Sequence, residues 1–310
     1  PCPRAHDAFA LDAAVSGFYT VNKVIFRRPA MTGLVLEGGT FRPIFSAGVM
    51  DALLKEDILL PYCIGVSAGI SDAYSYISRQ IGRNLQIVEA YRNDERYLGP
   101  KNLLRCRSVF GLDFVFDEIP NRLIPFDMKT FLSYKGKFVV GVTNARTGKS
   151  EYLDGLIDDR KFTASRATCA MPLLFPSIRI NGEKYYDGGV ADPIPAQHAL
   201  SDGCGRLILV LTQPKGYRKR LGKQTKAAAR LLSVKYPALS KALLERHLVY
   251  NRQVLFCEEL EKQGRALILR PESPLNSFEK DIETLRQTYR MGHALCESRM
   301  DEIKAFIAQA

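Results

Sequence analysis

A serine flanked by glycines forms the most distinctive local pattern in the sequence. Residues 65–69 read GVSAG, between an apolar run at 62–66 and a segment with helical spacing at 67–82. This pattern between a strand and a helix is typical of a sharp turn that exposes a serine hydroxyl above a sheet. The N-terminus of the helix would favour developing negative charge. We expect Ser67 to be a nucleophile; the alternative is a glycine-rich turn that only packs the helix.

A glycine-rich loop follows the first apolar strand. Residues 37–42 read EGGTFR, and successive glycines allow main-chain N–H groups to converge on one anion. The loop is neither a G-x-G-x-x-G motif nor a P-loop. In an acyl-transfer enzyme it would stabilise the oxyanion, where one donor lowers the barrier by about 2.7–4 kcal/mol. Arg42 adds a permanent charge, and the alternative is a phosphate-binding turn without catalysis.

An aspartate followed by two glycines lies at the end of a later expected strand. Residues 185–189 read YYDGG, and the glycines leave room for Asp187 to face a neighbouring loop. A carboxylate hydrogen-bonded to Ser67 would orient the hydroxyl and take its proton. Because an unperturbed aspartate has a pKa of about 3.9, it is a weak base. Such a dyad would therefore depend on the oxyanion loop for much of its power.

Together, EGGTFR, GVSAG and DGG resemble the patatin-like phospholipase family in their types and their order. Residues 164–176, ASRATCAMPLLFP, also look like the family's segment before the aspartate strand. The resemblance covers about 33–195, and the chain beyond looks like bacterial members with a helical C-terminal extension. It implies hydrolysis of fatty acyl esters of lipids by a Ser-Asp dyad without histidine, metal ion or cofactor. By position, Ser67 would be the nucleophile, Asp187 the base, and Gly38, Gly39 and Thr40 the oxyanion loop beside Arg42.

Two positions depart from the family's pattern. Thr40 stands where the family commonly has a third glycine, and a β-branched residue is costly wherever φ is positive. Pro43 replaces the glycine usual after the basic residue, and proline has no N–H to donate. Fewer donors in the loop would mean low activity or an unusual substrate.

Two other functions fit parts of the same pattern. His198 follows Asp187 by eleven residues, and the order Ser, Asp, His is that of α/β-hydrolases. However, His198 falls on an expected helix that leads away from the DGG turn. The glycine loop and the basic residues could also bind a phosphorylated ligand or an anionic lipid headgroup without cleaving it.

Strands that alternate with helices predict a three-layer α/β/α sandwich with a mostly parallel central sheet. The expected strands are 33–37, 62–66, 137–143, 178–186, 206–212 and 266–269, and the stretch between 83 and 136 is expected to be rich in loops. Residues 1–30 have no sustained periodicity and are predicted to be a peripheral extension, with the native start near Met31. We expect a catalytic domain at 31–215 and a C-terminal helical cap at 216–310.

Composition limits the partners. The chain has 310 residues, 46% of them hydrophobic, and no apolar stretch of the length that a membrane span needs. Its seven cysteines contain no CxxC pair, so we expect reduced thiols and no metal in a cytoplasmic protein. Seven of the eleven excess positive charges lie in residues 215–230. This tract is either a solvated helix end or a peripheral contact with an anionic membrane at the inner face, and it matches no nucleic-acid motif.

An acyl chain needs an apolar slot in the fold. Residues 171–175, MPLLF, lie just before the aspartate strand, and we expect them either to line such a slot or to pack in the core. Tyr74 and Tyr76, on the helix after Ser67, could face either the slot or the core.

Overall fold

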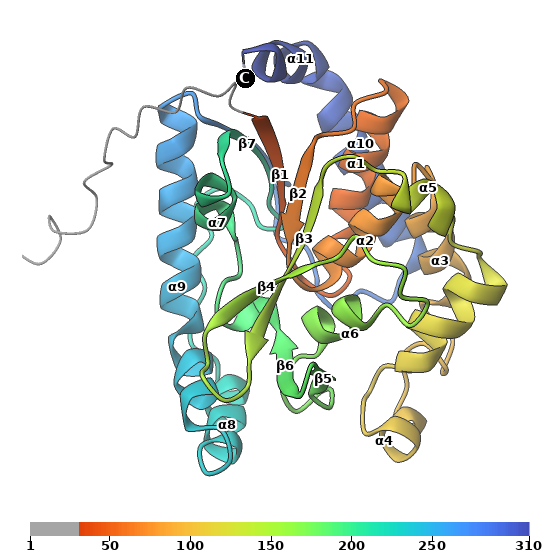
Figure 1. Cartoon of the computed structure of the whole chain (residues 1–310), viewed down its shortest axis with the longest axis vertical. Coiled ribbons are helices and arrows are strands. Elements are labelled where there is room, and N and C mark those ends of the chain that lie inside the picture. Colours follow the sequence, from red (N-terminus) through yellow and green to blue (C-terminus); the bar gives the residue numbers. More distant parts are fainter. Residues whose placement is uncertain (1–30, 310) are drawn as a thin grey trace, which may run out of the picture.

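The computed structural model describes residues 31–309, apart from the side chains of 105 and 106 (Figure 1). The predicted extension at 1–30 lies outside the described residues. In the part that is described, eight strands form one sheet in the order β5-β6-β3-β2-β1-β7-β8, and β4 pairs with β3. The strands are β1 (Met31–Leu36), β2 (Tyr62–Gly65), β3 (Lys137–Asn144), β4 (Ser150–Asp154), β5 (Ile178–Ile180), β6 (Glu183–Asp187), β7 (Cys204–Val210) and β8 (Ala266–Leu269).

The centre of the sheet is parallel, and one edge of it is antiparallel. Strands β3, β2, β1, β7 and β8 pair in parallel, whereas β4 and β6 pair antiparallel with β3. Strand β1 is buried on both faces, as expected for a central parallel strand of continuous apolar residues. Leu34 and Leu36 enter one core cluster and Val35 enters the other. The carboxyl ends of β1 and β2 therefore meet at one edge of the sheet.

Helices cover both faces, which confirms the predicted three-layer α/β/α architecture. One face carries α1 (Ile44–Lys55), α2 (Ser67–Ile77), α10 (Ile282–Ser298) and α11 (Met300–Ala308), and the other carries α7 (Ala196–Ser201) and α9 (Pro237–Lys262) (Figure 1). Three short elements lie near the end of the sheet that carries the DGG turn. They are α6 (Thr163–Cys169), the 3-10 turn η2 (Gly188–Val190) and α8 (Lys223–Leu232).

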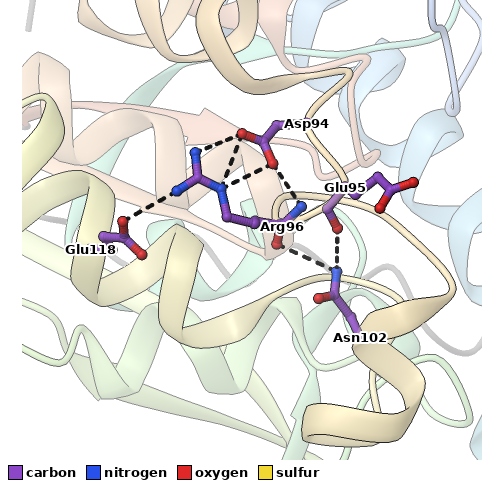
Figure 2. Close-up of polar contacts among 5 residues, drawn as sticks. All are labelled: Asp94, Glu95, Arg96, Asn102 and Glu118. Atoms are coloured by element: carbon purple, nitrogen blue, oxygen red, sulfur yellow. Dashed lines mark hydrogen bonds and ion pairs between the residues drawn. The ribbon is translucent and has the colours of Figure 1, made fainter.

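The stretch between 83 and 136 is more helical than the sequence predicts. It contains α3 (Arg83–Tyr91), α4 (Lys101–Cys106), the π-helix η1 (Phe114–Leu123) and α5 (Met128–Leu132). Figure 2 shows Arg96 between Asp94 and Glu118, at 2.8 and 3.4 Å. In the same view Asn102 donates to the carbonyl oxygen of Glu95 at 3.0 Å. These contacts join the loop after α3 to η1 and α4, where apolar periodicity gives little indication of structure.

The expectation of one strand at 178–186 is wrong. The segment is a hairpin, with β5 and β6 antiparallel around Asn181 and Gly182. Both turn residues have positive φ, 49° and 86°, as the Asn-Gly pair of a tight hairpin requires. Strand β4, which the sequence analysis did not predict, pairs with β3 along Val139–Thr143. The DGG turn therefore follows the second strand of a hairpin.

The C-terminal part of the chain contributes both a strand and helices. Strand β8 pairs in parallel with β7 and has the predicted bounds. Helix α10 crosses α1 closely, because a Cβ on Gly48 would lie 2.1 Å from the Tyr289 carbonyl oxygen and one on Gly292 would lie 2.0 Å from that of Phe45. The domain boundary near 215 stays a prediction. No helix among the described residues has the length and hydropathy needed to span a membrane.

Candidate active site

Ser67 stands at the turn from β2 into α2, where the backbone is held in a rare conformation. Its φ is 54°, a left-handed value that costs about 1–3 kcal/mol for a residue other than glycine. The Ser67 N–H donates to Thr168 Oγ1 at 2.8 Å, and that hydroxyl donates in turn to the carbonyl oxygen of Gly141. Gly69 permits the turn because a Cβ there would lie 2.3 Å from the Glu37 carbonyl oxygen. Thr168 is a positioning residue that the sequence analysis did not single out.

Asp187 ends β6 and faces this turn. Its Oδ2 accepts a hydrogen bond from Ser67 Oγ at 2.9 Å, and its Oδ1 accepts one from the Gly189 N–H at 2.8 Å. The side chain is buried, with Asp187 only 2% exposed. Burial raises the pKa of Asp187, while the charge of Arg246 and the bond from Ser67 oppose that shift. A carboxylate with a raised pKa is a stronger base than a solvated aspartate.

The glycine loop passes directly over Ser67. A Cβ on Gly38 would lie 2.6 Å from Ser67 Cβ and 3.5 Å from Ser67 Oγ, so only glycine allows this approach. The N–H groups of Gly38, Gly39 and Thr40 have no acceptor among residues 31–309. Thr40 has a φ of 58°, so the β-branched residue occupies the left-handed region where it is costly. Unpaired N–H groups beside the serine are what an oxyanion site requires.

Arg42 is part of the support of this loop. Its Nε donates to Thr212 Oγ1 at 3.1 Å, and its Nη1 donates to Ser277 Oγ. Nη2 lies 3.6 Å from Glu37 Oε1, and the other oxygen of Glu37 accepts the Thr212 N–H at 2.8 Å. With these partners the guanidinium fixes the ends of the glycine loop, which favours a positioning role for Arg42 within the predicted oxyanion site.

Two contacts from the C-terminal part hold the site, and the sequence analysis missed both. Arg246, on α9, donates from Nε to the Gly189 carbonyl oxygen at 2.6 Å. Ser277 accepts the Phe41 N–H through its carbonyl oxygen at 3.2 Å, besides its bond from Arg42. No local pattern could have identified them, because an arginine on an amphipathic helix and a serine in a loop are ordinary surface residues.

The serine, the aspartate and the glycine loop line one cavity of about 930 Å³. This volume is near the upper end for sites that bind small organic ligands. Its lining includes apolar side chains, here called the apolar wall, namely Tyr74, Phe110, Phe126, Phe162 and the predicted segment 171–175. Tyr76 does not line the cavity; its hydroxyl donates to the Ile58 carbonyl oxygen at 3.0 Å. A cavity that combines this apolar wall with the polar groups around Asp187 fits an amphiphilic ester.

Asp72 lines the cavity as well, besides Asp187 and Glu37, and the sequence did not indicate it. It lies on α2 and lines the cavity together with Arg83. Burial raises the pKa of Asp72 to about 8, the charge of Asp51 adds to the shift, and Arg83 opposes it. Its carboxyl group is therefore a weaker acid than that of a solvated aspartate.

Several other predicted residues lie elsewhere. His198 does not line the cavity; it stacks on Tyr152 with ring centroids 3.5 Å apart, and its Nε2 lies 3.7 Å from Asp202 Oδ1. Of the basic tract, Lys219 and Arg220 line the cavity. The five cysteines whose side chains are described have free thiols. Within residues 31–309 no group of three His, Cys, Asp or Glu side chains is arranged for a metal ion.

Comparison with protein-family models agrees with the sequence motifs. A family model described as patatin-like phospholipase matches residues 34–200, which is more than half of the chain, and a domain of unknown function, DUF6363, matches 236–308. The uncharacterized protein YjjU of Escherichia coli K12 is 25% identical over 280 residues, 87% of this chain and 76% of that protein. VipD from Legionella pneumophila aligns with a TM-score of 0.46 and 13% identity, over 87% of this chain and 67% of that one.

Proposed function

The chain belongs to the patatin-like phospholipase family, and we propose that it hydrolyses fatty acyl esters of lipids with Ser67 as nucleophile and Asp187 as base. Family membership implies a lipid acyl hydrolase, typically a serine hydrolase. The observation that carries the proposal is the 2.9 Å bond from Ser67 Oγ to Asp187 Oδ2, across 120 positions of the chain. It lies on the wall of a cavity that also has unpaired N–H groups.

The geometry supports a two-step acyl transfer. Ser67 Oγ attacks the carbonyl carbon of the ester while its proton passes to Asp187 Oδ2. The oxyanion that forms is held by the N–H groups of Gly38, Gly39 and Thr40. The alcohol leaves with the proton from Asp187, so an acyl-enzyme remains on Ser67. Water then attacks that ester while Asp187 accepts a proton from it, and Asp187 returns this proton to Ser67 Oγ as the fatty acid is released.

Labelling with a fluorophosphonate tests the nucleophile directly. We expect the native protein to react at Ser67 and the Ser67→Ala variant to remain unlabelled. p-Nitrophenyl esters of increasing chain length then test the apolar wall, because longer chains should lower KM until the cavity is filled. A folded protein that resists the reagent at Ser67 would instead support a module that binds anionic lipid without cleaving it.

We also propose a peripheral contact with anionic membrane through the exposed part of 215–230. Lys223, Lys226 and Arg230 are exposed on α8, and the neighbouring apolar side chains of Leu231 and Val234 are 71% and 94% exposed. Basic residues beside exposed apolar groups favour an anionic lipid surface. Gln224 and Thr225 of the same helix line the cavity, so this contact would bring the cavity to the lipid.

Co-sedimentation with vesicles tests the contact. We expect binding to vesicles that contain phosphatidylglycerol, weaker binding to phosphatidylcholine alone, and loss of the difference in a Lys223→Gln/Lys226→Gln variant. Lys129→Gln/Lys135→Gln removes the same charge from exposed positions around α5 and serves as the matched control. Equal binding by both double variants would contradict the assignment to α8.

A further inference from the structure

Two basic side chains that line the cavity near Asp187 are not used by the reaction steps above. Lys219 and Arg246 line the cavity together with Asp187. Arg246 makes its bond to Gly189 through Nε, and its two terminal nitrogens have no hydrogen-bond partner among residues 31–309. Lys219 Nζ lies 4.5 Å from the centroid of the Tyr250 ring. Neither cation forms an ion pair within the described part of the chain.

Helix α9 holds both side chains in place. The Lys219 N–H donates to Asn251 Oδ1 at 2.8 Å, and the Lys219 carbonyl oxygen accepts from Asn251 Nδ2 at 3.0 Å. Arg246 and Tyr250 are one turn apart on the same helix, so they lie on the same side of it. Because Tyr250 also contacts Lys219 Nζ, the lysine side chain loses less rotamer freedom than an unrestrained lysine would when a ligand arrives.

The charges around this pair are not balanced. Glu37 is paired with Arg42, which leaves the carboxylate of Asp187 facing two cations. Burial and the positive charges of Arg246 and Arg42 lower the pKa of Lys219 to about 7, although Glu37 and Asp187 act in the opposite direction. Burial lowers the pKa of Arg246 as well. An anion that entered this part of the cavity would offset the unfavourable burial of both charges.

We propose that Lys219 and Arg246 form a subsite for the phosphate of a glycerolipid headgroup, which lies there while the ester is beside Ser67. The subsite rests on the proposed function, because it assumes an ester at Ser67. Headgroup phosphate and glycerol ester are only a few bonds apart, and Arg246 contacts Gly189, two residues after Asp187. A fatty acid carboxylate is less suitable, because it forms at Ser67 itself. The acyl chain would then lie along the apolar wall.

Two soluble esters with the same acyl group test the subsite. 1-Octanoyl glycerol 3-phosphate carries the phosphate and 1-octanoyl glycerol does not, and octanoate release is measured for both below their micellar concentrations. We expect the native protein to have the higher kcat/KM for the phosphate ester. Lys219→Met should reduce the ratio of the two kcat/KM values by about 10- to 100-fold, as for loss of a charged hydrogen bond. Lys215→Met removes the same charge from the same tract outside the cavity and should keep the ratio.

Several outcomes would overturn the subsite. They are a native preference for the neutral ester, an equal loss on both esters in Lys219→Met, or the same change in Lys215→Met. An equal loss on both esters would mean that Lys219 acts on Asp187 and not on the substrate. Inhibition of neutral-ester hydrolysis by inorganic phosphate, compared with acetate, separates a phosphate subsite from a general anion or carboxylate site.

A binding measurement keeps the subsite testable even if no ester is hydrolysed. Calorimetric titration of 1-octanoyl glycerol 3-phosphate into Ser67→Ala and into Ser67→Ala/Lys219→Met needs no turnover. A weaker affinity in the double variant supports the subsite, and equal affinities contradict it. Failure of the proposed function appears separately, as a native protein that turns over neither ester.

Discussion

The segment matched by the patatin-like model and the segment after it contribute to the cavity in different ways. Residues 34–200 contain the serine, the aspartate and the glycine loop. Residues 236–308 contain none of these, yet Arg246 holds the carbonyl oxygen of Gly189 and Ser277 holds Arg42 and Phe41. The groups that would react thus come from strand ends, and their support comes from the other part of the chain.

The two segments position the groups of the site by different means. Groups at the carboxyl ends of parallel strands meet wherever such a sheet forms, so the first segment brings Ser67 and the glycine loop together through its own topology. The turn after Asp187, in contrast, is held by α9, which also supplies Gln253 to accept the Ile194 N–H at 3.0 Å. We infer that the C-terminal segment fixes the position of Asp187 and supplies a positive charge, that of Arg246, beside it.

The largest effect is expected for the reacting group itself. Ser67→Ala should lower kcat by at least about 10³-fold, because Ser67 Oγ is the hydroxyl that is hydrogen-bonded to the Asp187 carboxylate. Hydrolysis of a neutral p-nitrophenyl ester measures this, with unchanged circular dichroism as the control for folding. Substantial activity in this variant would contradict the assignment of the nucleophile to Ser67 in residues 34–200.

The next largest effect tests the glycine loop. Gly38→Ala places a Cβ 2.6 Å from that of Ser67, so the loop must move. Its N–H groups then no longer point at the position of the oxyanion. We expect kcat to fall by about 10²-fold with a small change in KM, which is typical of a lost oxyanion donor. An unchanged midpoint of unfolding in urea is the control for folding. An active Gly38→Ala protein would place the oxyanion elsewhere.

The fold and the main motifs could be predicted because they depend on the residue types within short stretches of the sequence. The apolar strands, the GVSAG turn and the bounds of β8 all follow from residue types along the chain. The hairpin at 178–187 was missed although Asn181-Gly182 is a strong turn signal. The support from Arg246 and Ser277 could not be predicted, since their contacts join positions 57 and 235 residues apart and depend on the packing of whole helices.

A substitution in the helix crossing separates stability from activity. Gly292→Ala brings a Cβ to 2.0 Å from the Phe45 carbonyl oxygen, so α10 and α1 must move apart. We expect a loss of about 2–3 kcal/mol in the free energy of unfolding, measured in urea. Specific activity of the folded fraction should change little, because neither helix carries a reacting group. If activity falls while stability is kept, α10 has a direct role in the site.

The charge of Arg246 should appear in the pH profile. Protonated Asp187 cannot take the proton of Ser67, so kcat/KM rises with pH as Asp187 deprotonates. Arg246 opposes the rise in pKa that burial imposes on Asp187, so Arg246→Met should move the acid limb to higher pH. On that limb, the rate for a neutral ester should fall in proportion to the fraction of Asp187 that is protonated.

Two matched variants refine the Arg246 result. Arg246→Lys keeps a charge but loses the geometry of the bond from Nε. Compared with Arg246→Met, it should bring the acid limb back toward its native pH, while kcat recovers less. Arg252→Met removes a charge from an exposed position of α9 and should leave the profile unchanged. An acid limb that does not move in Arg246→Met would confine this arginine to packing and anion binding.

The smallest effect is expected for His198, which also lies within the patatin-like segment. Its ring stacks on Tyr152, whose hydroxyl donates to Asp192 Oδ2, and it does not line the cavity. His198→Ala should therefore change kcat/KM for a neutral ester by less than about twofold, because the proposed base is Asp187. A loss close to that of Ser67→Ala would instead favour a Ser-His-Asp enzyme and would make α7 a second source of reacting groups.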